Sequence, residues 1–380
     1  MAEVILLGNS ARIALPVLQA LHCAGYTRCA VLGGADTWGL RWSQLCHQYL
    51  RIDLRQDDAV VQVINRMAQH NPQAILLPFD CEAIRLVNRV QGRLELKSMP
   101  VPDLSTLNLF DDKWAFYQFC VAHDLPVPKT RFVGPKSNLV FNALQADLGL
   151  PFIVKPTNES GSHGVQVVHS RAELEQKILN NACYQFKPLI AQTYIEGIDM
   201  DINLFGVAGQ LQAVSVHRPG QSFIDFVPHP KLEEIAEKIC RFSHYNGVMN
   251  ADVRLDKNTG DVFLIESNPR FWATLASTVD CGLNFAAECL KPTEPCLVPL
   301  RLTSGRSYTR HPILRPSSWW QLISDRTERG RLLRAKAFDL YSLGQLMMDV
   351  PAILKRAVKR VCSRKHGTPN GVSLSFGEHR

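Results

Sequence analysis

The sequence predicts an α/β, Rossmann-like N-terminal domain, followed by an α+β layer and a mostly helical C-terminal extension. In the first part of the chain, short apolar runs alternate with amphipathic helical stretches, which is typical of a parallel sheet. Beyond Pro151, apolar and polar residues alternate with a period of two, and turn residues separate the runs. This second pattern predicts antiparallel strands, and the amphipathic stretch Lys231–Phe242 predicts a helix that covers them.

The first predicted strand, Val4–Leu7, ends at Gly8. No G-x-G-x-x-G signature accompanies this glycine, so the sequence does not predict binding of NAD or FAD. Two roles are open for the Gly8 turn: it receives part of a substrate at the carboxyl ends of the strands, or it is a plain strand-to-helix turn. Further strands and helices are predicted at Cys29–Leu32, Asp58–Gln69, Ala74–Pro78 and Cys81–Val90.

The amino-acid composition bears on the ligands, the cysteine chemistry and the compartment of the protein. The 42 Lys and Arg residues exceed the 35 Asp and Glu residues only mildly, which suits anionic small ligands and gives no evidence of nucleic-acid binding. The 11 cysteines form no C-x-x-C pair, so neither a zinc site nor a disulfide framework is predicted, and a reducing cytoplasm is expected. The N-terminus lacks the basic lead of a signal peptide, and no apolar run reaches the roughly 20 residues of a membrane span.

A loop of small residues joins two predicted strands, Phe152–Lys155 and Val165–Val168. Small residues let backbone N–H groups surround phosphate oxygens, and Lys155 adds a positive charge beside them. The order differs from a Walker A loop because the lysine precedes the glycines. Phosphate binding is the favoured interpretation and a flexible hairpin loop is the alternative; the loop holds Asn158, Ser160, Gly161, Ser162 and Gly164.

A second lysine, Lys113, lies in the first turn of a predicted helix that Asp111 or Asp112 can cap. A cation at a helix N-terminus is electrostatically unfavourable. Its position therefore suggests an anion for it to contact.

The stretch Asn250–Arg270 predicts a β-hairpin with a turn centred near Thr259. Such a turn would place Asp252 opposite Glu266, and Asn250 opposite Asn268. Facing carboxylates repel each other, and a hard divalent cation with oxygen ligands would relieve that repulsion. A solvated sheet face is the alternative.

Five motifs in this order resemble the ATP-grasp superfamily, specifically its carbamoyl-phosphate-synthetase-like branch. They are DKWAFYQF with LPVPKT, PFIVKP with its small-residue loop, LIAQTYIEGIDMDINLF, NADVRLD and IESNPR. The resemblance covers roughly Glu3 to Phe285. It implies a Rossmann-like domain over residues 1–110, an ATP-grasp small lobe over 111–195 and a large lobe over 196–292, before a basic connector and helical tail over 293–380.

The resemblance also implies roles for individual residues. Asp252, Glu266 and Asn268 match ligands of Mg²⁺, with Mn²⁺ as a substitute for it. Arg270 matches a basic residue that faces phosphates or the acyl phosphate, and Arg254 is a second anion contact. Many relatives carry Glu at the position of Gln192, so the contact between Gln192 and adenine stays open. Either Asp199 or Glu196 would bind the ribose. The matches for ATP are Lys113, Lys155, the loop Ser160, Gly161, Ser162, His163 and Gly164, the hinge Gln192, Thr193, Tyr194, Ile195 and Glu196, and Asp199.

The implied activity is a ligase that activates a carboxylate as an acyl phosphate for attack by an amine, and releases ADP and phosphate. The alternatives are activation of bicarbonate, as in biotin carboxylase or carbamoyl phosphate synthetase, and a non-catalytic ATP-binding scaffold at a membrane surface. The expected partners are small-molecule carboxylate and amine substrates, without nucleic acid, and a second copy of the chain is a candidate partner.

The region beyond Lys291 departs from the resemblance. Thr293–Pro316 is rich in Pro, Ser and Arg and predicts a connector or extended arm. Ala337–Arg360 has helical periodicity with a break at Pro351. It either lies in the plane of a membrane surface or packs on the body of the protein; the membrane alternative uses Leu343, Leu346, Met347, Ile353 and Leu354 as the apolar face and Lys355, Arg356, Lys359 and Arg360 as the basic one.

Overall fold

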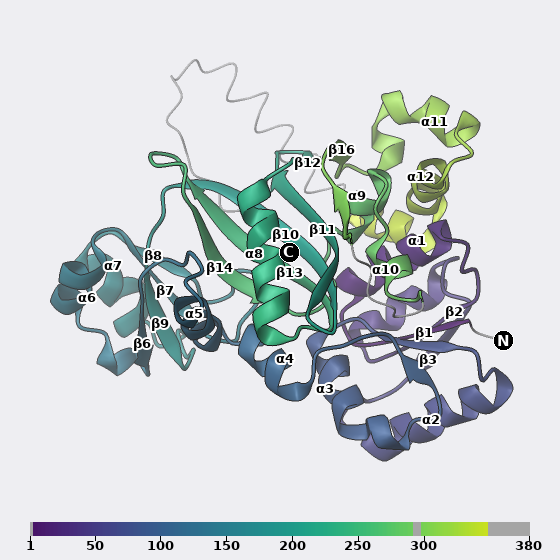
Figure 1. Cartoon of the computed structure of the whole chain (residues 1–380), viewed down its shortest axis with the longest axis horizontal. Coiled ribbons are helices and arrows are strands. Elements are labelled where there is room, and N and C mark those ends of the chain that lie inside the picture. The colour runs from purple at the N-terminus through teal and green to yellow at the C-terminus, as the bar shows by residue number, and fades with distance from the viewer. Residues whose placement is uncertain (1–2, 292–297, 349–380) are drawn as a thin grey trace.

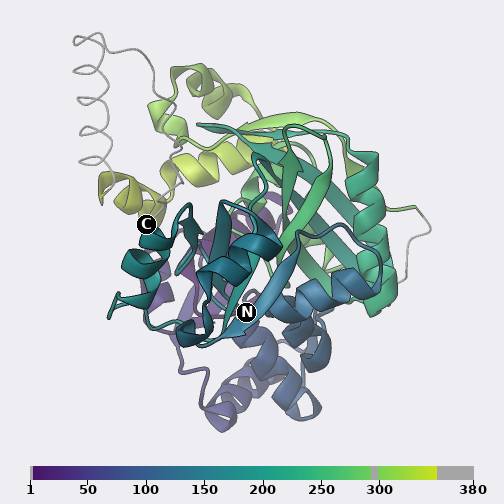
Figure 2. The same ribbon diagram turned by 90° about the vertical axis from the view of Figure 1, so that its left-hand side faces the viewer.

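The computed structural model describes residues 3–291 and 298–348, and these residues form three β-sheets (Figure 1). The sheet of the N-terminal residues lies at the lower right of that view, the smallest sheet at the left, and the largest sheet between them. Figure 2 shows the molecule from the side of the smallest sheet, which stands in front of the largest one.

The N-terminal sheet has the strand order β3-β2-β1-β4-β5, and its strands are all parallel. This confirms the predicted parallel sheet. The two edge strands, β3 and β5, do not appear in the sequence prediction, because they are short and expose polar residues instead of forming an apolar run. The elements are β1 (Val4–Leu7), α1 (Ala11–Cys23), β2 (Cys29–Gly33), β3 (Gln48–Arg51), α2 (Asp57–His70), β4 (Ile75–Pro78), α3 (Cys81–Val90), β5 (Lys97–Ser98) and α4 (Leu104–Asp111).

The smallest sheet has the order β6-β9-β7-β8 and is antiparallel. The helix that precedes it begins at Lys113, and the Asp112 carboxylate caps it by accepting the N–H groups of Trp114 and Ala115, both at 2.9 Å. The elements are α5 (Lys113–Ala122), β6 (Thr130–Gly134), α6 (Phe141–Leu148), β7 (Phe152–Pro156), β8 (Gln166–Val168), α7 (Arg171–Leu174) and β9 (Leu189–Thr193).

The largest sheet has the order β14-β13-β10-β11-β12-β16, and β15 pairs with β11. The apolar residues of one face pack under α8, the covering helix that the sequence predicts. The opposite face carries polar side chains. The elements are β10 (Gly197–Val207), β11 (Gln210–Pro219), β12 (Phe223–Phe226), α8 (Pro230–Ser243), β13 (Gly247–Asp256), β14 (Val262–Asn268), α9 (Leu275–Asp280), α10 (Phe285–Glu288), β15 (Leu300–Leu302) and β16 (Gly305–Tyr308).

The region after residue 298 is more than a connector. β15 and β16 extend the largest sheet, and α11 (Trp319–Ser324) and α12 (Glu328–Phe338) follow them. Leu332 and Ala335 of α12 lie in the same core cluster as the buried face of α1. Asp339 is buried and accepts hydrogen bonds from Ser43 Oγ at 2.6 Å and from the Gln44 N–H at 2.9 Å. These contacts join the C-terminal helices to the N-terminal domain.

The described part of the predicted tail helix packs on the body of the protein. Residues 340–348 are helical, and the Tyr341 ring lies so close to Gly39 that a Cβ there would meet it at 2.5 Å. Leu343 and Leu346 are half-buried and Met347 is exposed. None of the described helices is both long and apolar enough to cross a bilayer. The remaining residues of the membrane interpretation, Ile353, Leu354, Lys355, Arg356, Lys359 and Arg360, lie outside the described residues.

The structure favours the plain-turn interpretation of Gly8. The Asp80 carboxylate accepts the N–H groups of Asn9 at 2.6 Å and Ser10 at 3.1 Å, and Asp36 accepts the N–H of Ala11 at 2.8 Å. Carboxylates therefore already satisfy the backbone donors that an anionic substrate group would need.

Replacing Gly8 should destabilise the N-terminal domain. Gly8 has a φ of 156°, and a Cβ at this position would lie 2.5 Å from the Phe79 ring and 2.7 Å from Asp80 Oδ2. We expect Gly8→Ala to lower the free energy of unfolding by about 2–3 kcal/mol, measured by denaturant titration. Gly92→Ala is the control, because a Cβ added there would have no neighbour within 4 Å and the backbone has no positive φ. Equal stability of the two variants would show that the protein accommodates a Cβ at Gly8 without loss of stability.

Candidate active site

Two rows of polar side chains cross the open face of the largest sheet. The register places Asp252 opposite Glu266 and Asn250 opposite Asn268, which confirms the predicted hairpin. On the other side of β13, Asp201 pairs with Asp252 and His217 pairs with Asp201. The first row is therefore His217, Asp201, Asp252 and Glu266, and the second is Ser215, Asn203, Asn250 and Asn268.

The first row concentrates negative charge. Burial raises the pKa of Asp252 well above its ordinary value, and the neighbouring Glu266 and Asp201 carboxylates raise it further. Burial also opposes ionisation of Asp201, yet His217, whose Nε2 lies 3.1 Å from Asp201 Oδ2, lowers the pKa of that carboxyl. Asp201 thus has a close partner in His217, while Asp252 and Glu266 keep a repulsion that a cation would relieve.

The second row is a chain of amide hydrogen bonds. Asn250 Nδ2 donates to Asn203 Oδ1 at 3.1 Å and to Asp201 Oδ1 at 3.3 Å, and Asn268 Nδ2 donates to Asn250 Oδ1 at 3.4 Å. Arg270 in turn donates to Asn268 Oδ1 at 2.9 Å. Asn250 has no task predicted from the sequence, but the structure makes it the link between the two rows.

The two predicted lysines meet at the other wall of the site. The Lys113 ammonium lies 3.2 Å from Glu266 Oε2 and donates to the Glu159 carbonyl at 2.5 Å. The Lys155 ammonium donates to the Ile265 carbonyl at 3.1 Å, which ties the smallest sheet to β14. Burial lowers the pKa of Lys155 to about 8, and the charge of Lys113 lowers it too, against the opposite effect of Glu266. Lys113 thus pairs with a carboxylate, whereas Lys155 forms no ion pair among the described residues.

The small-residue loop lies at the edge of this site. Its residues from Ser160 to His163 are exposed, and both Gly161 and Ser162 have positive φ angles, 65° and 63°. The loop is anchored at its far end, where Tyr184 Oη donates to the Gly164 carbonyl at 2.7 Å. The exposed backbone N–H groups suit phosphate oxygens.

Gln192 lies in a buried position on β9 of the predicted hinge. Its Nε2 donates to Thr130 Oγ1 at 2.8 Å, and Thr130 itself donates to the Pro128 carbonyl, which orients the amide. Gln192 Oε1 is then left as a buried acceptor without a partner, and Thr157 Oγ1, just after the end of β7, is also unpartnered. A buried acceptor and an unused hydroxyl fit a ligand that carries an amino group, such as adenine.

The rest of the hinge is held by Arg254. Its Nε donates to the Ile195 carbonyl at 3.0 Å, its guanidinium pairs with Asp199, and Tyr194 lies under it with 6.0 Å between the guanidinium carbon and the ring centre. Glu196 pairs with Lys257, and Thr193 Oγ1 donates to the Leu148 carbonyl at 3.3 Å. The structure thus places Arg254 against the hinge, whereas Arg270 lies beside Asn268.

The residues fit a divalent cation without already forming a closed site. Among the described residues, no three His, Cys, Asp or Glu side chains are arranged as a metal site. Asp252, Glu266 and Asn268 are two carboxylates and one amide, which leaves coordination positions for water and phosphate, as Mg²⁺ prefers.

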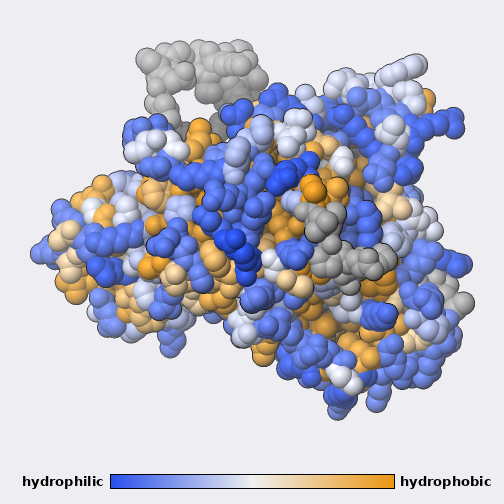
Figure 3. Space-filling view, viewed as in Figure 1, coloured by the Kyte–Doolittle hydropathy of each residue, from blue (hydrophilic) through white to orange (hydrophobic). Residues whose placement is uncertain are grey.

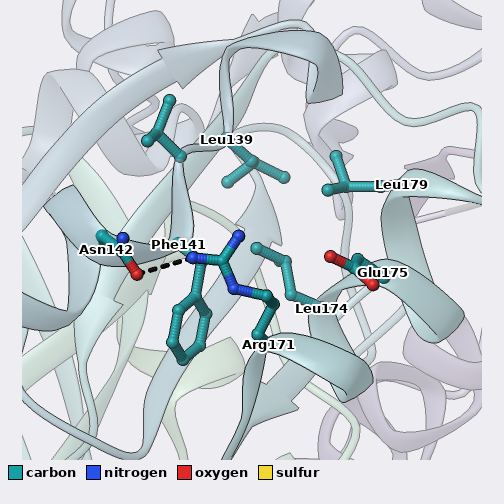
Figure 4. A pocket seen from close by; sticks show the side chains of 8 residues that line it. Leu139, Phe141, Asn142, Arg171, Leu174, Glu175 and Leu179 are labelled. Atoms are coloured by element: carbon teal, nitrogen blue, oxygen red, sulfur yellow. Dashed lines mark hydrogen bonds between the residues drawn. The ribbon is translucent and has the colours of Figure 1, made fainter.

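Asp201 and Asn203 are site residues that the sequence interpretation missed. Their alternation with apolar residues on β10 was the available signal. A separate pocket between the start of α6 and the region of α7, lined by Leu139, Phe141, Arg171 and Leu174 among others, contains none of the predicted site residues (Figure 4).

The central part of the chain is similar to known ligases and ATP-grasp proteins. A family model described as the D-ala D-ala ligase C-terminus matches residues 122–229, and one described as ATP-grasp in the biosynthetic pathway with Ter operon matches residues 185–295. A D-alanine–D-alanine ligase of Erythrobacter litoralis is 28% identical over 50% of this chain, which spans only 65% of that relative's length.

Solved structures share the fold at low sequence identity. Biotin carboxylase from Campylobacter jejuni, in a β,γ-ATP complex, has a TM-score of 0.61 at 18% identity, with coverage of 80% of this chain and 74% of that one. An L-amino acid ligase from Bacillus licheniformis has a TM-score of 0.56 at 16% identity, with coverage of 77% and 75%.

Proposed function

Because this chain belongs to the ATP-grasp superfamily, we propose that it is an ATP- and Mg²⁺-dependent ligase that joins a carboxylate to an amine. The observation that carries the proposal is the convergence of Lys113 and Lys155 on the carboxylate row at Glu266. Two anions, ATP and a carboxylate, must approach each other in this reaction, and cations on one wall facing metal ligands on the other offset their repulsion.

The proposed reaction has two steps. An oxygen of the substrate carboxylate attacks the γ-phosphorus of ATP, the bond to the bridging oxygen breaks, and ADP leaves. The amine then attacks the acyl carbon, phosphate leaves, and the nitrogen loses a proton. Lys113 and Lys155 stabilise the phosphate charge, and the loop from Ser160 to Gly164 excludes water from the acyl phosphate, which water would otherwise hydrolyse.

The residue roles follow from the contacts described above. Asp252, Glu266 and Asn268 would hold Mg²⁺, which would supply positive charge beside the β- and γ-phosphates, as Mn²⁺ would in its place. Gln192 Oε1 accepts a hydrogen bond from the adenine amino group. The hinge backbone at Tyr194 and Ile195 lies beside the adenine. Arg270 faces the transferred phosphate.

Two predicted roles are refined in this proposal. Arg254 holds the hinge through Ile195 and Asp199, so we assign it a positioning role in place of anion contact. Asp199 is engaged by Arg254 and still presents its second oxygen for a ribose hydroxyl. We keep residues 1–110, 111–195 and 196–292 as the domain boundaries and add β15 and β16 to the third unit. The proposed setting is the cytoplasm, and the proposal includes no membrane contact.

The test is a screen for ADP release. Purified protein with Mg²⁺ and ATP is incubated with amino acids and sugar acids crossed with amines, and mass spectrometry identifies the product. We expect ADP only where a carboxylate and an amine are both present, together with an amide product. ADP release that requires bicarbonate alone would favour bicarbonate activation, and absence of ATP binding by calorimetry would refute the proposal.

A further inference from the structure

Buried polar atoms without hydrogen-bond partners gather in two places in the described chain. Two of the eight such side-chain atoms, Thr157 Oγ1 and Gln192 Oε1, lie in the proposed nucleotide site. The other six lie on α9, on α12 or on segments next to these two helices: Trp272 Nε1, Asp280 Oδ1, Ser307 Oγ, His311 Nε2, Arg315 Nε and Arg329 Nε. Buried polar groups normally find partners, so a cluster without them calls for an explanation, and a missing ligand is one.

Three cations surround a single carboxylate in this second cluster. Asp280 ends α9, and its side chain is only 5% exposed. Arg329 Nε of α12 lies 2.9 Å from Asp280 Oδ1, but neither atom has a hydrogen bond of proper geometry. Lys336 of α12 and Arg315 also lie within electrostatic range of Asp280. The cluster therefore carries two more positive charges than negative ones.

The surplus cations have no other partner among the described residues. The Lys336 ammonium and the Arg315 guanidinium make no hydrogen bond or ion pair there, and Arg315 only stacks on Tyr308, with 4.4 Å from its guanidinium carbon to the ring centre. Burial lowers the pKa of both Lys336 and Arg315, so the surroundings penalise their charges. Uncompensated charge of this kind is costly unless a ligand neutralises it.

The cluster is open to solvent at one side. The Arg329 side chain is 41% exposed, and Lys336 and Arg315 are half-buried. In Figure 3 the surface over α11 and α12 is mostly hydrophilic on the face shown. A small polar ligand can therefore approach the three cations from water.

We propose that Arg315, Arg329 and Lys336 form a binding site for a phosphate group, either inorganic phosphate or a phosphate monoester. A phosphate group carries a charge of about −1.5 to −2 at neutral pH, which matches the surplus positive charge of the cluster. Guanidinium groups can donate two parallel hydrogen bonds to phosphate oxygens. Ser307 on β16, a strand that contacts α9, has a buried hydroxyl without a hydrogen-bond partner. The site is separate from the nucleotide site and does not depend on the proposed ligase activity.

The test uses the full chain with the nucleotide site disabled by Lys155→Met, so that phosphate cannot report on that site. Calorimetry with inorganic phosphate and with glycerol phosphate then measures binding in this background. We expect Lys336→Met and Arg315→Gln each to weaken binding by about tenfold or more. Lys238→Met, which removes a partly exposed lysine that pairs with Glu234 on α8, should leave the affinity unchanged.

Thermal unfolding separates lost binding from lost folding. Without phosphate, Lys336→Met should be as stable as its parent or more so, because it removes a penalised charge. With phosphate, only the parent and Lys238→Met should gain stability. Binding of glycerol phosphate but not of inorganic phosphate would support the site and identify its ligand as a phosphate monoester. Unchanged affinity in Lys336→Met, or no binding of either probe at millimolar concentration, would overturn the proposal.

Discussion

Glu266→Gln should lower the rate of ADP release by about a hundredfold to a thousandfold, because in the proposed reaction it removes a ligand of the cation that offsets the phosphate charge. Glu266 lies opposite Asp252 in the sheet and 3.2 Å from the Lys113 ammonium. The amide keeps the shape of the side chain but holds a divalent cation poorly and no longer pairs with the lysine. The rate is measured with a coupled ADP assay at saturating ATP.

The stability of the same variant gives an independent readout. Because Glu266 is one of the proposed metal ligands, its neutralisation should abolish the stabilisation of the protein by Mg²⁺. Glu234→Gln is the matched control, since Glu234 is exposed and, in the described part of the chain, pairs with Lys238 alone. Full activity in Glu266→Gln would show that Glu266 does not hold a metal ion that the reaction needs.

Lys155→Met should weaken ATP binding by about a hundredfold. Lys155 is 3% exposed, and among the described residues its ammonium donates to the Ile265 carbonyl alone. Its charge is therefore poorly compensated without a ligand and strongly attracts an anion. Calorimetry with Mg²⁺ and a non-hydrolysable ATP analogue measures the affinity.

The variant protein should remain folded, because methionine fills the space of the lysine stem and removes a buried charge. Lys129→Met is the control, since Lys129 is about half exposed and pairs with Asp147 outside the site. Equal affinity of Lys155→Met and the parent would show that the phosphates bind elsewhere.

The hairpin of β13 and β14 could be predicted from the sequence because its register depends on local features. The spacing of Asp252 from Asn250 and the turn residues between the strands determine which side chains face each other. His217 and Asp201 could not be placed in the same row, because that depends on β10 lying between β11 and β13. Strand order is a property of the folded chain and leaves no mark on local spacing.

The contacts of Arg254 also depend on strand pairing that the local sequence does not show. The sequence places it on the face of Asp252, where an anion contact is a reasonable expectation. The register opposite Asp199 gives it a nearer partner, and that register involves residues far apart in the chain.

The C-terminal region was the least predictable part. Proline, serine and arginine residues around β15 and β16 suggest a connector, yet these short strands complete the edge of the largest sheet beside β11 and β12. Their pairing needs a partner edge that only the folded sheet provides. The cation cluster under α12 likewise exists only because α9, α12 and the segment at Arg315 converge.

The central claim is that a carboxylate is phosphorylated by ATP at this site, and isotope transfer tests it directly. A substrate carboxylate that the ADP screen identifies is labelled with a heavy oxygen isotope, and the released phosphate is analysed by mass spectrometry. An acyl phosphate intermediate predicts that one labelled oxygen passes from the carboxylate to phosphate, with ADP as the nucleotide product. Unlabelled phosphate, or AMP with pyrophosphate, would contradict the account.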